Sequence, residues 1–224
     1  MKFISAISIS TLFLFSCNGK EEKHETKIDS SSSIQAEIKN TPAGFLEDLL
    51  SLKSESELKK KFGAGRISVD TIWGEQGAYV IGSFVDAHTK NEVQIMWRDF
   101  PKCTAVSEVI IESYSSPLKA EAFANEWKSK TGIHLGMPSG ELEKLNGKPF
   151  LVEYFNESVH GEISSWQNGN FNRKTTHVDL SAAGKMNGLS QKEMDELFKH
   201  YNIPSDNKVM QKVQPWVVKI AIYK

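Results

Sequence analysis

A short helix-ending stretch occurs twice in this sequence, and it limits how the rest of the chain can be arranged. The two copies, SELKKKFG at 56–63 and GELEKLNG at 140–147, share a Glu-Leu pair, a lysine and a final glycine. Ser54 and Glu57 have the spacing of a capping box before the first helix, and Ser139 can cap the second. Glycine readily takes the left-handed conformation that closes a helix. The sequence therefore predicts two helices, each ending at a glycine.

Segments with the period-two alternation of β-strands follow both helices. They lie at 67–71, 79–85, 93–97 and 106–112 in the first half, and at 150–155, 162–166, 176–181 and 216–223 in the second. Further helices are expected over 45–52, 117–130 and 190–200, and Asn168-Gly169 is a hairpin-turn signal. The predicted fold is α+β, with two tandem units, each one or two helices followed by an antiparallel meander of about four strands. The units span 45–116 and 117–224, with an inserted helix near 190–203.

Two stretches of the folded part resemble known proteins. The segment GIHLGM at 132–137, followed by ELEKLNGKPF at 141–150, and the strand at 91–97 resemble uncharacterised lipoproteins of Bacteroidota. The duplicated helix, its closing glycine and the strand order are similar, at the level of the fold, to β-lactamase inhibitor proteins. They are also similar to the small accessory lipoprotein of the outer-membrane β-barrel assembly machine. Because the lipoprotein group has no assigned chemistry, the resemblance implies a fold and transfers no active site.

The N-terminal segment has the pattern of a lipoprotein signal peptide. Lys2 precedes an apolar run over 3–15, which is too short to cross about 30 Å of hydrocarbon. The run ends in Leu14-Phe15-Ser16-Cys17, which resembles the bacterial lipobox, although Phe15 is larger than the usual residue. The resemblance implies that residues 1–17 are a signal peptide ending at Cys17, and that lipidated Cys17 anchors the chain to a membrane. An ordinary cleaved signal with an incidental cysteine is the alternative.

The residues after Cys17 bear on location. Lys20-Glu21-Glu22 is similar to the lipoprotein export signal of Bacteroidota, which implies the cell surface of the outer membrane; otherwise the anchor lies on the periplasmic face. A charged start to a solvated tether has the same composition. Residues 18–44 are polar and hold no aromatic residue, so we expect a flexible tether. The formal net charge of -1 gives no basic surface for nucleic acid.

Aromatic residues beside two predicted turns are the candidates for binding. Trp73 precedes the turn at 74–77, and Trp166 precedes the turn at 167–170, which contains Asn168. Tryptophan is favoured at interaction hot spots, so Trp73, Trp166 and Asn168 form the candidate binding rim. Packing over the ends of the sheet is the alternative role for both tryptophans. Separately, Asp70-Thr71-Ile72 resembles the short motif that is O-glycosylated on exported Bacteroidota proteins, which makes Thr71 a candidate modification site.

No pattern in the sequence assigns catalytic, metal or cofactor chemistry. Gly147 ends a helix, whereas the glycines of a phosphate-binding loop precede one. His160 and His177 lie on segments that antiparallel pairing can bring together, but no third metal ligand is identifiable. Two solvent-facing polar residues explain this pair equally well. Cys103 has no free partner for a disulfide and is expected to be buried.

These features favour a non-catalytic, lipid-anchored protein of the cell envelope that binds another envelope protein or a glycan. An absent motif is weak evidence against catalysis, because many active sites have no local signature. The competing hypothesis is an envelope hydrolase whose active site is assembled between the two units. A cleft holding acidic or histidine side chains with shifted pKa values favours the hydrolase. An exposed aromatic face of the sheet favours binding.

Overall fold

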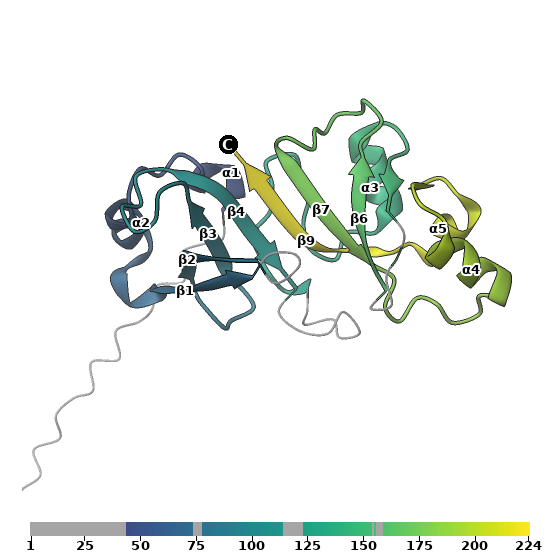
Figure 1. Ribbon diagram of the computed structural model, residues 1–224, viewed down its shortest axis with the longest axis horizontal. Coiled ribbons are helices and arrows are strands. Elements are labelled where there is room, and N and C mark those ends of the chain that lie inside the picture. The colour runs from purple at the N-terminus through teal and green to yellow at the C-terminus, as the bar shows by residue number, and fades with distance from the viewer. Residues whose placement is uncertain (1–43, 74–77, 114–122, 154, 156–158) are drawn as a thin grey trace, which may run out of the picture. The chain divides into compact units, whose positions relative to one another are not determined.

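The computed structural model describes residues 44–73, 78–113, 123–153, 155 and 159–224, so the predicted signal peptide and tether lie outside the described residues. Within these ranges the chain is α+β, as predicted, with nine strands and five α-helices (Figure 1). The helices are α1 (Leu46–Leu49), α2 (Glu55–Phe62), α3 (Ser139–Asn146), α4 (Gln191–Lys199) and α5 (Lys208–Val213), with a 3-10 turn over Ala64–Arg66. The strands are β1 (Ile67–Trp73), β2 (Tyr79–Val85), β3 (Val93–Trp97), β4 (Val106–Glu112), β5 (Leu151–Val152), β6 (His160–Ser165), β7 (Thr176–Ser181), β8 (Ile203–Pro204) and β9 (Trp216–Tyr223).

All nine strands belong to one continuous antiparallel sheet, in the order β1-β2-β3-β4-β9-β7-β6-β5-β8. Two separate meanders are therefore not observed, because β4 and β9, the last strands of the two predicted units, pair with each other. Both strands carry buried apolar residues on both faces, including Ile110 and Ile111 of β4 and Ile220 and Ala221 of β9. Either strand at an edge would expose an apolar surface and unpaired backbone groups. Their pairing buries both.

Both repeated stretches form helices of eight residues, each followed by a glycine, as predicted. Gly147 takes the predicted left-handed conformation, whereas Gly63, with φ 87° and ψ 136°, does not. The Ser54 side chain accepts the Glu57 amide, as predicted for α2. The Glu57 carboxylate accepts the amide of Lys53, one residue before the cap. At α3 the predicted serine cap is wrong, since Pro138 occupies the N-cap position and Ser139 is the first helical residue.

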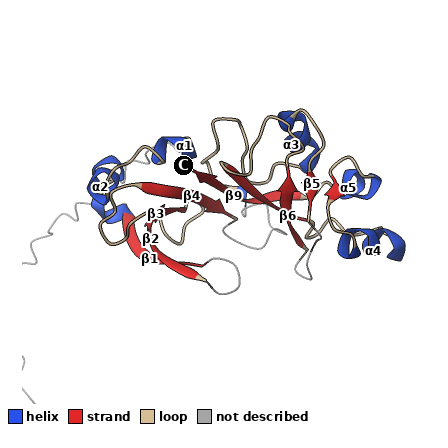
Figure 2. Cartoon of the chain, turned by 45° about the horizontal axis from the view of Figure 1, so that its top comes forward, coloured by secondary structure: helices blue, strands red, loops and turns tan. Residues whose placement is uncertain are grey.

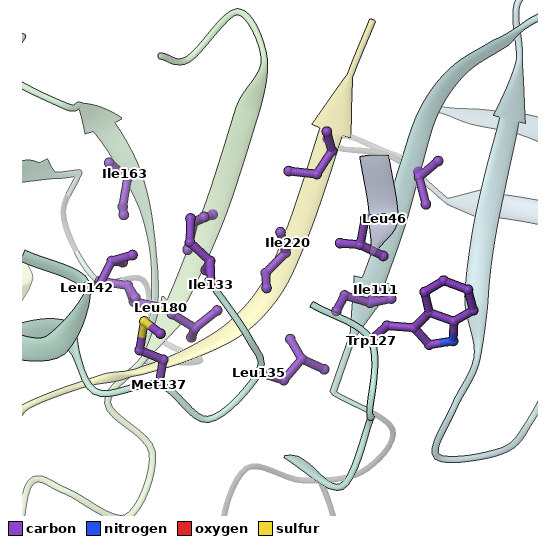
Figure 3. Packing of buried hydrophobic residues seen from close by; sticks show 14 of the residues in the cluster. Leu46, Ile111, Trp127, Ile133, Leu135, Met137, Leu142, Ile163, Leu180 and Ile220 are labelled. Atoms are coloured by element: carbon purple, nitrogen blue, oxygen red, sulfur yellow. The ribbon is translucent and has the colours of Figure 1, made fainter. Parts of the chain in front are cut away.

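The helix expected over 117–130 is also wrong in its described part, because residues 124–130 are not helical. Lys128 instead forms isolated β-bridges with Phe45 and His134. The segment continues to Met137, whose carbonyl accepts the Val217 amide of β9 at 2.9 Å. After residue 130 the buried apolar side chains occupy every second position, which is the pattern of an extended chain and not of a helix. Figure 3 shows three of them near the middle of the sheet: Ile133, Leu135 and Met137.

The two faces of the sheet are covered differently. α1, α2 and α3 lie on one side of it (Figure 2), and the main core forms between these helices, the segment at 127–137 and the inward residues of the strands. A smaller apolar cluster lies on the opposite face, which we call the second face. Its buried members are Ile72, Phe84, Ile110 and Ala221.

The helix predicted over 190–200 is present as α4. Ser190 and Glu193 form a reciprocal capping box at its start, and Leu197 is its fully buried residue. α4, β8 and α5 fill the interval between β7 and β9 along the sequence. None of the helices in the described ranges has the length and apolar character needed to cross a membrane.

Candidate functional site

The β1–β2 hairpin parts from the rest of the sheet along its outer half. β1 and β2 pair over their whole length, up to Trp73 opposite Tyr79, but β2 pairs with β3 only over 83–85. The parting begins at Gly82, where a Cβ would lie 2.7 Å from the Ile95 carbonyl oxygen and 2.4 Å from the Ile72 Cδ1. A glycine is required for this close approach.

A cleft of about 310 Å³ lies between the outer half of the hairpin and the second face of the sheet. This volume is at the lower end of the range of about 300–1,000 Å³ for ligand pockets. We call it the hairpin cleft. Its wall consists of the hairpin residues Ile72, Trp73, Ala78, Tyr79 and Val80, and its floor of the sheet residues Met96, Glu108, Ile110, His177, Lys219 and Tyr223.

The wall carries two exposed aromatic side chains. Trp73 is 69% exposed and Tyr79 is 64% exposed. The two residues are cross-strand partners, and their ring centroids lie 5.6 Å apart at an interplanar angle of 55°. Aromatic rings contribute large apolar contact areas when they are covered. Two such rings side by side in solvent therefore indicate a surface that contacts another molecule.

The floor is built on three alternate rungs of the β4–β9–β7 ladder. Alternate residues of a strand point to the same face of its sheet, so the side chains of these rungs share the second face. Polar and charged groups make up the two outer rungs, and the middle rung combines Ile110 and Ala221 with His177. The rungs are Glu108–Tyr223, Ile110–Ala221–His177 and Glu112–Lys219–Asp179.

Glu108 and Tyr223 share a side-chain hydrogen bond across their rung. Burial raises the pKa of the Glu108 carboxyl, against the smaller opposing effects of the Tyr223 hydrogen bond and the Lys219 charge. Burial also raises the pKa of Tyr223, and the charge and hydrogen bond of Glu108 reinforce this effect. Tyr223 is therefore neutral at physiological pH and donates its hydroxyl proton to Glu108.

His177 lies between two carboxylates. Its Nε2 is 2.9 Å from Asp179 Oδ1, and its Nδ1 is 3.4 Å from Glu162 Oε1. Burial lowers the pKa of His177, but the hydrogen bond and charge of Asp179, together with the charge of Glu162, outweigh burial and leave this pKa raised. Glu162 also accepts a hydrogen bond from Arg173. The imidazolium form is thus favoured in the folded chain.

We expect the free energy of unfolding to fall as pH rises through the raised pKa of His177. A raised folded-state pKa means that the stabilisation is complete below the ordinary value of 6.5 and is lost above the folded value. The raised pKa of Glu108 acts in the same direction, starting from its ordinary value of 4.5. Urea unfolding should be measured at several pH values between about pH 6 and about pH 8. The free energy of unfolding should fall less steeply with pH in His177→Gln than in the wild type. His200→Gln, at an exposed position, is the matched control. An unchanged slope in His177→Gln would contradict this assignment.

Lys219 is a cationic residue of the floor. In its rung it lies between Glu112 and Asp179, yet among the described residues its ammonium makes no ion pair. It lines the hairpin cleft together with Glu108. The floor therefore offers one ammonium donor and one carboxylate acceptor to a ligand.

Of the predicted rim residues, the cleft contains Trp73 and not Trp166. Trp166 is only 3% exposed. It packs edge-on against Phe150 and Phe171, with ring centroids 5.6 and 4.9 Å away, and its Nε1 donates to the Thr176 carbonyl at 3.3 Å. The alternative of core packing therefore describes Trp166, and the turn at 74–77 that follows Trp73 lies outside the described residues.

Asn168 is exposed in a turn that is displaced by one residue from the predicted one. The turn closes by a hydrogen bond from the Gly169 amide to the Trp166 carbonyl at 2.9 Å. Its central residues are Gln167 and Asn168, with φ of 51° and 55°, as in a type I′ turn. Gly169 serves a different purpose, since a Cβ there would lie 2.3 Å from Asn146 Oδ1. Asn168 does not line the hairpin cleft.

The remaining sequence candidates lie apart from one another. His160 is on a different rung from His177, because it faces Ser181 whereas His177 faces Ala221. In the ranges that the structure covers, no group of three or more His, Cys, Asp or Glu side chains is placed to hold a metal ion. Cys103 is buried, as expected, and burial raises the pKa of its thiol.

The floor residues were missed by sequence reasoning. Glu108, Lys219 and Tyr223 come from the two strands whose pairing was not expected, so no local signal brings them together. One indication is available in the sequence: each is a charged or hydroxylated residue inside an otherwise apolar strand. Such a residue on a two-sided buried strand must face a partner or a solvent-filled space.

Comparisons with protein-family models, with curated proteins and with solved structures gave no match to this chain.

Proposed function

We propose that the chain is a non-catalytic, lipid-anchored protein of the bacterial cell envelope, which binds an envelope component in the hairpin cleft. The observation that carries the proposal is the exposed Trp73–Tyr79 pair, which lines a cavity that also has charged residues in its floor. Lipidation at Cys17 and placement in the outer membrane, with the cell surface favoured over the periplasmic face, are part of the same proposal and rest on the sequence.

We also propose that the two halves derive from one duplicated unit. In support, α2 and α3 have equal length and are each followed by a glycine. The sheet order also has a symmetrical central part, in which β1-β2-β3-β4 is followed by β9-β7-β6-β5. The second half differs by the inserted segment that contains α4 and α5. The cleft lies beside the long β1–β2 hairpin of the first half. In the second half the strand that corresponds to β1 is β5, which has only two residues.

The competing function is an envelope hydrolase. The raised pKa of Glu108 beside the cleft favours it, because a carboxyl with such a pKa can serve as a general acid. Two observations favour binding instead. Glu108 is hydrogen-bonded to Tyr223, and His177 is held by Asp179 and Glu162 and not by a nucleophile. Glu108→Gln distinguishes the two functions, since it would abolish turnover in a hydrolase and only weaken binding in a binding protein.

Retention on immobilised envelope material tests the proposed site. Detergent-solubilised full-length protein is passed over beads that carry envelope extract of the producing cells. Trp73→Ala is expected to lower retention about tenfold or more, as for an aromatic hot-spot residue. Tyr201→Ala is the matched control, because Tyr201 is also 69% exposed and lies outside the cleft. Equal retention of Trp73→Ala and wild type, or no retention of the wild type, would overturn the proposal.

A further inference from the structure

We infer that the hairpin cleft binds an uncharged saccharide, with one pyranose ring stacked on the Trp73–Tyr79 wall and its hydroxyl groups hydrogen-bonded to the floor. The inference rests on the proposed function, since it names the class of ligand for the same site.

The cleft has two chemically different sides. The wall is apolar and aromatic, with Trp73 and Tyr79 at its outer end and the buried Ile72 behind them. The floor presents Glu108 and Lys219. A pyranose ring has the same two-sided character, because its axial C–H groups form an apolar patch while its hydroxyl groups project from the rim. C–H groups over aromatic rings, and hydroxyl groups against a carboxylate and an ammonium, are favourable pairings.

The charges of the floor disfavour an ionic ligand of either sign. An anionic group near Lys219 would meet Glu108 in the floor, and Glu112 and Asp179 in the same rung as Lys219. A cationic group near Glu108 would meet the ammonium of Lys219 in the same floor. Groups of like charge that share one small cleft repel each other. A neutral ligand with both donors and acceptors avoids both repulsions.

A purely apolar ligand is disfavoured for a different reason. It would remove water from Glu108 and Lys219 without replacing the hydrogen bonds that water makes to them. Burying polar or charged groups without such bonds is costly. A ligand that carries several hydroxyl groups can donate to the carboxylate and accept from the ammonium at once. The space of about 310 Å³ suits one or two sugar rings and not a long chain buried along its whole length.

Trp73 supplies a direct optical signal for this inference. It is 69% exposed, whereas Trp97, Trp127 and Trp166 are 7%, 4% and 3% exposed and Trp216 is half-buried. Acrylamide therefore quenches Trp73 most readily, and a ring stacked on Trp73 is expected to protect it. Trp73→Phe removes this signal while keeping an aromatic ring in the wall.

The test uses full-length protein in detergent and a fixed set of probes: glucose, galactose, mannose, N-acetylglucosamine, cellobiose and chitobiose. Glucosamine and glucuronic acid are the matched cationic and anionic probes. Calorimetry and acrylamide quenching are expected to detect binding of at least one neutral saccharide. The affinity for that saccharide should be about tenfold lower in Trp73→Ala and in Glu108→Gln than in the wild type. Tyr201→Ala should bind as the wild type does. Unchanged thermal unfolding of the variants shows that they are folded.

Two outcomes overturn the inference. One is that no neutral saccharide in the set binds or protects Trp73 from acrylamide. The other is that glucosamine or glucuronic acid binds more tightly than every neutral probe. In one case the saccharides neither bind nor displace the protein from immobilised envelope material, while retention on that material still depends on Trp73. The proposed binding function then stands and the saccharide inference is wrong.

Discussion

Replacing Cys17 with alanine is expected to abolish incorporation of labelled palmitate and to make the protein extractable from membranes by an alkaline wash. The physical reason is the strength of the proposed anchor, since each buried CH₂ of an acyl chain contributes about 0.8 kcal/mol and two or three chains hold far more firmly than one. The uncleaved apolar run over 3–15 is too short to replace such an anchor.

Cys103→Ala is the matched control for this experiment, because Cys103 is the other cysteine of the chain and is buried in the folded part. It should retain both the label and the membrane association. If Cys17→Ala remained as firmly in the membrane fraction as the wild type, the lipoprotein proposal would be wrong.

Protease treatment of intact cells distinguishes between the two faces of the outer membrane. Digestion of the folded part indicates the cell surface, and full protection indicates the periplasmic face.

Replacing Asn146 with alanine is expected to lower the free energy of unfolding by about 3 kcal/mol. Asn146 is the last residue of α3 and is fully buried. Its Nδ2 donates to the carbonyls of Lys148 at 2.8 Å and Trp166 at 3.0 Å, and its Oδ1 accepts the Phe171 amide at 3.3 Å. Alanine leaves the buried carbonyl of Trp166, the part-buried carbonyl of Lys148 and the buried amide of Phe171 without these partners. Urea unfolding measures the loss, and Lys148→Ala, which changes only an exposed side chain, should be nearly neutral.

Gly169 provides a second measure of the same contact. A Cβ at this position would lie 2.3 Å from Asn146 Oδ1, and Asn146 cannot move away without losing its hydrogen bonds. Gly169→Ala alone should therefore be strongly destabilising. In the double variant Asn146→Ala, Gly169→Ala the clash is absent, so the two losses should be clearly less than additive. Additive losses would show that the two residues do not interact as described.

Local patterns in the sequence predicted most helices and strands, but they did not predict which strands pair with each other in the sheet. α2 and α3 were predicted from a capping serine, an apolar spacing or a closing glycine, all of which act within one turn of helix. The helix expected over 117–130 was wrong in its described part, because Lys128 exchanges backbone hydrogen bonds with Gly44 and Leu46, and Met137 further on accepts the Val217 amide. Contacts of that kind come from distant parts of the chain.

The candidate site was predicted only in part for the same reason. Trp73 could be identified because it stands beside a turn signal. Glu108, Lys219 and Tyr223 could not, because they meet only through the register of β4 against β9. Trp166 has the same local surroundings as Trp73 but is buried by Phe150 and Phe171. The difference between a tryptophan in the core and one in a binding site thus depends on residues far away in sequence.

The central place of β9 in the sheet has a consequence for how the protein folds. β9 follows every other strand in the sequence, yet it fills the gap between β4 and β7. Until residues 216–223 are available in the folding compartment, β4 and β7 each keep an unpaired apolar edge, and such edges recruit strands from other chains. Folding is therefore completed by the last strand and not half by half. We expect the chain to gain or lose its structure in one cooperative step, which is complete only when residues 216–223 have joined the sheet.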